Sequence, residues 1–145
     1  MLALASDHGG FELKQAVKQY LDQKGIAYTD FGCHDGEACD YPDMAEAACQ
    51  AVAGKTCERA LLFCGTGIGI SMAANKIPGI RAAACSDSYS ARMTRAHNDA
   101  NALCMGGRVV GPGLAIELVE AFLTTEFEGG RHSRRVDKLS QLEKR

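Results

Sequence analysis

The sequence lacks the features that would direct it to a membrane or to nucleic acid. No apolar run is long enough to cross a bilayer, and the chain begins MLALASDHGG without a basic leader, so we expect neither a membrane helix nor a secretory signal. The formal net charge is only -2, which gives no general attraction to nucleic acid or to anionic lipid. We therefore expect a cytoplasmic protein without membrane or nucleic-acid partners.

Closely paired cysteines are also absent. None of the seven cysteines forms a C-x-x-C motif, so a structural zinc site is not expected. Their odd number and the missing leader favour a reducing compartment, in which the thiols stay free and most act as small buried hydrophobic residues. The seven are Cys33, Cys39, Cys49, Cys57, Cys64, Cys85 and Cys104.

The chain has no linker, internal repeat or low-complexity tract, so its 145 residues predict one domain, 1–145. Short apolar runs alternate with amphipathic segments of helical period. We predict strands at 1–5, 26–31, 60–64, 80–85 and 102–105, and helices at 11–24, from Pro42, at 68–76, 88–97 and 112–124. This order is typical of an α/β protein with a mostly parallel, about five-stranded sheet covered by helices on both faces.

A further helix is predicted at 131–145, after the turn formed by Glu128-Gly129-Gly130. Its only apolar residues are Val136, Leu139 and Leu142. Because this stripe is too sparse to bury against its own core, we expect the helix to need another surface, such as that of a second subunit.

Small and polar residues cluster where predicted strands end. They are SDHGG at 6–10, CGTGIG at 64–69, SD at 86–87 and GGR at 106–108. Ligands bind at the carboxyl ends of the strands in open parallel sheets, so we expect these groups to meet at one edge.

The stretch LLFCGTGIGIS at 61–71 places three alternate glycines after a cysteine. It is neither a dinucleotide fingerprint nor a C-x5-R phosphatase loop, because both would need a different residue at Ile70, and no Gly-Lys-Ser/Thr follows to make a P-loop. Its amides could hold a phosphate or an oxyanion, and their field would favour a thiolate at Cys64. The alternative is a tight turn with an inert buried cysteine.

The other polar candidates also keep structural alternatives. His8 and His97 could be satisfied histidines, Asp7 and Asp87 could be helix caps, and Asn98 with Asp99 could simply end a helix. The basic run from Arg131 to Arg135 could be a solvated face, although a helix would present these two arginines as a fork for an oxyanion. Nucleic acid is disfavoured there because no aromatic residues are interleaved.

Taken together, the motifs resemble ribose-5-phosphate isomerases of type B, in a family that also contains galactose-6-phosphate and allose-6-phosphate isomerases. The resemblance runs nearly end to end and is carried by DHGGF from Asp7, DYP from Asp40, CGTGIGISMAANK from Cys64, IRAAACSDSYSA from Ile80, HNDxN from His97 and EGGRHSRRV from Glu128. It implies a three-layer Rossmann-like fold with a C-terminal helix, and catalysis with no metal and no cofactor. It also implies a homodimer or a dimer of dimers with shared active sites.

The resemblance further implies an aldose-ketose isomerase that interconverts ribose 5-phosphate and ribulose 5-phosphate through an enediolate, in the non-oxidative pentose phosphate pathway. Cys64 would be the base that moves a proton between C2 and C1, Thr66 would assist it, and His97 would open the sugar ring. We expect Cys64, His97 and the loop amides to lie at the same edge of the sheet. The implied substrate-binding residues are Asp7, His8, Tyr41, Gly65, Gly67, Ile68, Gly69, Asn98, Arg108, Arg131 and Arg135; of these, the amides from Gly65 to Gly69 would hold the enediolate oxygen, and His8 with the three arginines would bind phosphate.

Two other functions remain open. The substrate could be a six-carbon sugar phosphate, or the protein could be a sugar-phosphate sensor without catalysis. Some family members replace the cysteine base with a glutamate in the following helix, but residues 71–75 read SMAAN, so Cys64 is the only base of this kind here. We also expect Arg131 and Arg135 to act across a subunit boundary.

Overall fold

The computed structural model describes all residues 1–145 and shows a five-stranded sheet in which every pair of neighbours is parallel. The strand order is β2-β1-β3-β5-β4. The strands are β1 Leu2–Ser6, β2 Tyr28–Asp30, β3 Arg59–Cys64, β4 Ala82–Ala84 and β5 Ala102–Gly106. The predicted α/β fold is therefore confirmed, although β2 and β4 at the two sheet edges are shorter than predicted.

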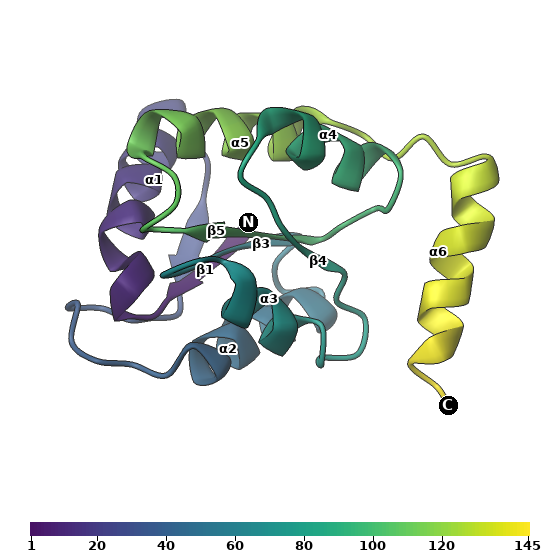
Figure 1. The fold of residues 1–145 in the computed structure, drawn as a ribbon, viewed down its shortest axis with the longest axis horizontal. Helices are drawn as coiled ribbons and strands as arrows, with labels where there is room; N and C mark the ends of the chain where they lie inside the picture. The colour runs from purple at the N-terminus through teal and green to yellow at the C-terminus, as the bar shows by residue number, and fades with distance from the viewer.

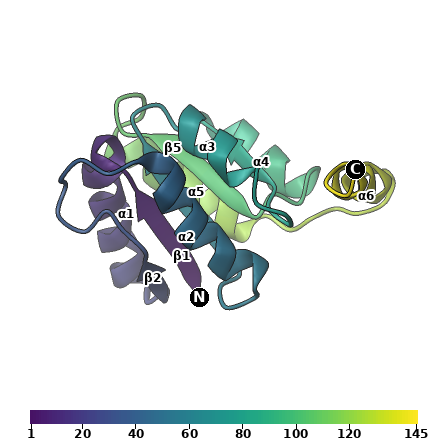
Figure 2. The same cartoon turned by 90° about the horizontal axis from the view of Figure 1, so that it is seen from below.

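Helices cover both faces of this sheet, as Figures 1 and 2 show. They are α1 Phe11–Lys24, α2 Tyr41–Ala53, α3 Ile68–Ala74, α4 Ser88–Ala96, α5 Pro112–Thr124 and α6 Arg131–Leu142, with a short 3-10 turn, η1, at His8–Gly10. The helix ends follow local chemistry. Gly25 ends α1 in a left-handed conformation with φ 69°, and Asp87 caps α4 by accepting the Ser90 N–H.

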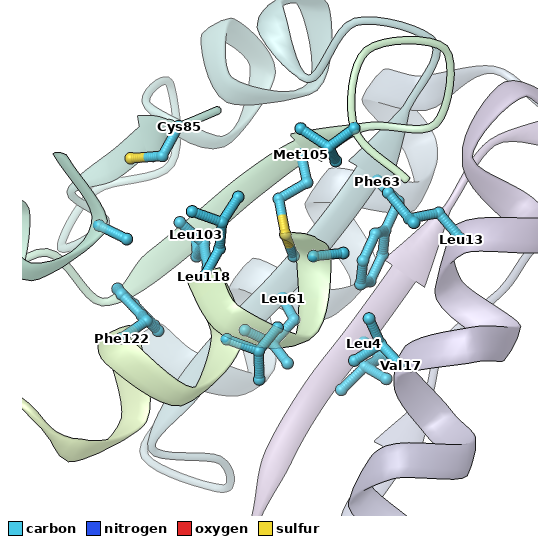
Figure 3. Close-up of a cluster of buried hydrophobic side chains, with 14 of the residues drawn as sticks. Leu4, Leu13, Val17, Leu61, Phe63, Cys85, Leu103, Met105, Leu118 and Phe122 are labelled. Carbon is cyan, nitrogen blue, oxygen red and sulfur yellow. The ribbon is translucent and has the colours of Figure 1, made fainter. Parts of the chain in front are cut away.

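The two faces of the sheet carry side chains of different size, because alternate residues of a strand point to opposite faces. Leu4, Leu61, Phe63, Leu103 and Met105 face α1 and α5, where they form the larger-residue core drawn in Figure 3. The opposite face packs against α2 and α3 with mostly small residues, Ala3, Ala5, Ala60, Leu62, Cys64, Ala102 and Cys104. Small side chains let α2 and α3 lie close to the strands, so Cys64 belongs to the closely packed side.

Helix α6 stands apart from this body, at the end of an extended segment that follows α5 (Figures 1 and 2). Only His132 and Val136 of α6 are buried, whereas Leu139 and Leu142 remain exposed. The predicted separate helix is confirmed, and its apolar stripe is left largely uncovered. None of the helices combines the length and the apolar character needed to span a bilayer.

The expectation that every cysteine is a free thiol is wrong for two of them. Cys33 and Cys39 form a disulfide within the loop that joins β2 to α2. The chain turns back on itself between these residues, so cysteines six positions apart come into bonding contact. The remaining five cysteines are free and buried, as predicted.

Candidate active site

The site forms at the carboxyl edge of the sheet, around the turn that follows β3. Cys64 ends β3 and is only 4% exposed, and its sulfur accepts a hydrogen bond from the N–H of Gly67 at 3.1 Å. Gly67 has φ 79°, and a Cβ there would lie 2.9 Å from the carbonyl carbon of Met105. The position therefore needs glycine, and the resulting turn aims a backbone donor at the thiol.

The amides of this turn are not equivalent. Gly67 N–H is engaged by the sulfur, and Ile68 N–H donates to Thr66 Oγ1 at 3.2 Å. The N–H groups of Gly65 and Thr66 donate to no protein acceptor. Unpaired backbone N–H groups next to a base are suited to bind an oxyanion. The N–H of Gly69 likewise has no protein acceptor, so of the predicted donating amides those of Gly65, Thr66 and Gly69 are unpaired, whereas those of Gly67 and Ile68 are engaged within the turn.

Neighbouring loops hold this turn from two sides. Gly107 N–H donates to Cys64 O at 2.8 Å, and Arg108 N–H donates to Gly65 O at 3.0 Å. Gly9, after β1, packs so closely that a Cβ there would lie 3.1 Å from Gly65 N. The Arg108 guanidinium lies against Gly65, since a Cβ on that glycine would be 3.3 Å from Nη1. The loops after β1, β3 and β5 therefore meet at one edge, as predicted.

A cavity of about 490 Å³ opens beside these loops. It contains His8 and Arg108, the two phosphate-binding positions implied for this edge. Its wall also includes three residues that the sequence did not single out, Phe11, Glu12 and Asp35. Phe11 ends the DHGGF motif but was given no role, whereas Glu12 in α1 and Asp35 in the disulfide-closed loop belong to no motif, so only the fold brings these two to the cavity.

Two further predicted residues lie near the turn. Asp7 is buried and caps η1, with Oδ1 accepting the Gly10 N–H at 3.1 Å. Of its two predicted roles, helix cap and substrate binding, this oxygen therefore performs the first. The Tyr41 ring rests on Gly69, where a Cβ would be 2.8 Å from the ring carbon Cζ. Asp7 and Tyr41 thus border the turn from the β1 and α2 sides.

His97 and Asn98 lie at the opposite, amino edge of the sheet, which corrects the expectation that His97 shares an edge with Cys64. Helix α4 runs back across the sheet, and His97 ends it just before Asn101, whose carbonyl accepts the N–H of Ala60 at the start of β3. Strand β3 is about 20 Å long at roughly 3.3 Å per residue. Within one chain the side chains of Cys64 and His97 therefore lie at opposite edges of the sheet and do not meet.

Arg131 and Arg135 also lie on this far side. Both are exposed on α6, which begins close to the end of α4 because Glu128 N–H donates to Ala96 O at 3.0 Å. The expectation for His97 was wrong for a topological reason. Residues that follow a helix lie at the amino edge of a parallel sheet, and His97, Asn98 and α6 all follow helices.

His97 has two partners that sequence reasoning missed. Its ring stacks on that of His132, with centroids 4.2 Å apart and planes 11° from parallel. Both rings approach Glu128, at 3.9 Å from His97 Nε2 and 3.8 Å from His132 Nε2. His132 is buried although it lies in the basic run that was expected to be solvated. The i, i+4 spacing of Glu128 and His132 was the only available signal. These three side chains are also the group with the spacing for a metal ion.

The remaining thiols differ from Cys64 in their surroundings. Burial raises the pKa of Cys49 to about 12 and that of Cys85 to about 11, and it raises the pKa of Cys104 well above its usual value. Thiols held protonated in this way are poor bases and nucleophiles. The structure therefore leaves Cys64, with its backbone donor and its neighbouring cavity, as the thiol best placed for proton transfer.

The chain is similar to known proteins over almost its whole length. The sequence model described as Ribose/Galactose Isomerase matches residues 2–139. Ribose-5-phosphate isomerase B of Escherichia coli is 46% identical over 144 residues, which cover 99% of this chain and 97% of that protein.

Solved structures are also similar to this chain over almost its whole length. Ribose-5-phosphate isomerase B of Clostridium thermocellum superposes with a TM-score of 0.97 at 50% identity, covering 99% of this chain and 97% of that one. The Mycoplasma genitalium ribose-5-phosphate isomerase B with bound ribulose-5-phosphate superposes with a TM-score of 0.94 at 39% identity, covering 99% and 95% of the two chains.

Proposed function

Because the chain belongs to the ribose/galactose isomerase family, we propose that it interconverts ribose 5-phosphate and ribulose 5-phosphate through an enediolate. The observation that carries this proposal is the turn at the end of β3. There a thiol accepts a backbone hydrogen bond, the N–H groups of Gly65, Thr66 and Gly69 are unpaired, and a cavity with His8 and Arg108 opens alongside. A base, oxyanion donors and a phosphate subsite are the groups that this isomerisation needs.

The proposed chemistry is a proton transfer at adjacent carbons. The Cys64 thiolate removes the proton on C2 of the open-chain aldose, and the electron pair moves onto O1, which the N–H groups of Gly65 and Thr66 stabilise. Return of the proton to C1, with transfer of the O2 proton to O1, gives the ketose. His8 and Arg108 would hold the phosphate away from the reacting carbons, and this remote binding orients C1 and C2.

We further propose that a second copy of the chain completes each site. Ring opening needs a proton-transfer group, and His97 lies at the far edge of its own sheet. Arg131 and Arg135 lie exposed beside it on a helix that stands apart from the body (Figure 1). Next to the Cys64 turn, Ile68 and Met72 are exposed one helical turn apart, which provides an apolar surface that a partner could cover. The amino edge of the partner's sheet, with His97 and α6, would then face the carboxyl edge that carries the Cys64 turn.

A substrate comparison tests which sugar phosphate is used. We expect kcat/KM for ribose 5-phosphate to exceed that for allose 6-phosphate and galactose 6-phosphate by at least roughly 100-fold, since an extra carbon displaces either the phosphate or C2 from its partner groups. Higher kcat/KM for a six-carbon substrate would transfer the proposal to that sugar. Ribose 5-phosphate binding with no exchange of the C2 proton in deuterated water would favour a sensor instead.

Replacement of the base tests the mechanism. Cys64→Ala should lower kcat by roughly 100-fold or more, because general-base catalysis contributes on this scale, while ribulose 5-phosphate still binds. Titration calorimetry and a coupled isomerase assay measure the two effects. The matched control is Cys57→Ala, which removes another buried thiol at the opposite end of β3. A Cys64→Ala protein that turns over as fast as Cys57→Ala would rule out the proposed role.

A further inference from the structure

Two histidines and one glutamate form a compact group at the amino edge, between α4 and α6. The nitrogens of His97 and His132 and an oxygen of Glu128 lie within 4.8 Å of one another. Three segments bring them there: His97 ends α4, Glu128 is held beside that helix end by its N–H bond to Ala96 O, and His132 lies in the first turn of α6. The group is thus built by the backbone and not by chance contact of long side chains.

The side chains approach one another without bonding directly. Both Nε2 atoms stand 3.8 to 3.9 Å from Glu128 Oε1, which is too long for a hydrogen bond. Zinc bonds to imidazole and carboxylate are 2.0–2.2 Å long, so tetrahedral ligands lie about 3.4 Å apart. The two rings are stacked with planes 11° from parallel, so binding of an ion requires the more exposed His97 ring to turn until both imidazole nitrogens face the ion together with the Glu128 oxygen.

The three side chains are also of the types that bind zinc. Two imidazoles and a carboxylate are a common set for catalytic zinc, with the fourth position open. His97 and Glu128 are partly exposed, which gives an ion a path from solvent, whereas His132 is buried and held in place. From this geometry we propose that His97, Glu128 and His132 form an inhibitory site for a zinc-like divalent ion.

Inhibition follows from the identity of one ligand, and this part rests on the proposed function. His97 can move a proton to the sugar ring only while its nitrogen is free, so an ion bound to Nε2 removes the proposed ring-opening group. The charges of Arg131 and Arg135 act on the neighbouring His132 and oppose a cation. We therefore expect micromolar and reversible binding, not a permanently occupied site.

Zinc titration of the full chain tests the site without any use of activity. The Cys64→Ala protein serves as the parent, so that the proposed base thiol does not compete for zinc. We expect one zinc ion per chain in the calorimeter, and an affinity at least roughly tenfold lower in Glu128→Gln and His132→Gln. His34→Gln, which removes an exposed histidine from a distant loop, is the matched control and should bind zinc like the parent. Glu128→Gln changes a largely exposed side chain, so the test survives if His132→Gln fails to fold.

Equal zinc affinity in the parent, Glu128→Gln and His34→Gln would overturn the site, as would the absence of binding at millimolar zinc. A second measurement addresses inhibition in the protein with Cys64 intact. Zinc should lower kcat, a chelator should restore it, and Glu128→Gln should need roughly tenfold more zinc for the same loss. Zinc binding without loss of activity would overturn the inhibitory role. If the chain proved to have no isomerase activity, the calorimetric result would still decide the metal site.

Discussion

At the scale of single residues, Cys64 differs from the other free cysteines through its backbone surroundings. All five free thiols are buried; burial raises the pKa of Cys49, and burial together with the nearby Asp87 carboxylate raises the pKa of Cys85. Cys64 is distinguished by the Gly67 N–H that points at its sulfur. The residue type was visible in the sequence, but the donor depends on how the turn folds.

Comparison of Gly67 with Gly79 distinguishes the effect of close packing in the turn from the effect of a left-handed backbone conformation alone. Gly67 and Gly79 both have positive φ, 79° and 88°, but only Gly67 has neighbours within 4 Å of a would-be Cβ. We expect Gly67→Ala and Gly79→Ala each to lose about 1–2 kcal/mol from the left-handed conformation, with a larger loss for Gly67→Ala because of its contact with Met105. Urea unfolding measures this difference.

The same pair gives a kinetic comparison. Gly67→Ala should also lower kcat/KM by at least roughly tenfold, since about 1.4 kcal/mol of lost transition-state stabilisation has this effect. Gly79→Ala, which lies outside the turn, should keep the wild-type value. Similar kcat/KM in the two variants would mean that the position of the Gly67 amide does not matter for turnover.

At the scale of elements, a buried ion pair fixes α1 to the end of β2. Lys14 is fully buried, and its Nζ donates to Asp30 Oδ1 at 2.9 Å and to the Cys33 carbonyl. Lys18 donates to the other carboxylate oxygen, also at 2.9 Å, from a partly exposed position. Burial raises the pKa of Asp30, but the hydrogen bonds from Lys14, Gly32 and Lys18 more than offset this and lower it.

The two lysines should therefore differ in their effect on stability. We expect Lys14→Met to cost about 3 kcal/mol, since it removes a partner from a buried charge, and Lys18→Met to cost less than about 1 kcal/mol. Chemical unfolding at neutral pH measures both. Equal losses would show that burial of the first lysine is unimportant.

The pH dependence of this contribution has a defined sign. The folded protein holds the pKa of Asp30 below its usual value of 3.8, so the unfolded chain takes up the proton first as the pH falls. The stabilisation is thus fully present above pH 3.8 and is lost as the pH falls through the lower folded value. The difference between wild type and Lys14→Met should shrink over the same range.

At the scale of the whole molecule, the proposed catalytic groups occupy two opposite edges of one sheet. Cys64, His8 and Arg108 lie at the carboxyl edge, and His97 lies at the amino edge. Helix α6 follows on the amino side (Figure 1). A parallel sheet keeps these edges apart by the length of its strands. This separation is the reason for the proposal that a second copy brings the two sets of residues together.

Mixed variants test this arrangement. Cys64→Ala and His97→Asn should each be nearly inactive alone, because every site of either protein lacks one group. After subunit exchange at a 1:1 ratio, half of the dimers are hybrids with one intact site of two, so about a quarter of wild-type activity should return. Exchange is verified by mass spectrometry of differently labelled subunits. No recovery in a verified mixture would show that each site lies within one chain.

Much of this protein is determined locally by its sequence. Helices 11–24 and 112–124 were predicted with the bounds that the structure shows, because apolar period, first-turn proline and terminal glycine act over a few residues. The same local chemistry marked the Cys64 turn and the cluster of polar residues at one strand edge.

The tertiary structure decided what depends on distant segments. It set the strand order, joined Cys33 to Cys39, stacked His97 on His132 and placed His97 at the far edge from Cys64. A sequence motif states which groups are present, but the edge of the sheet that each one reaches depends on whether it follows a strand or a helix. Distances between such groups arise from packing of the whole chain, and no local pattern contains them.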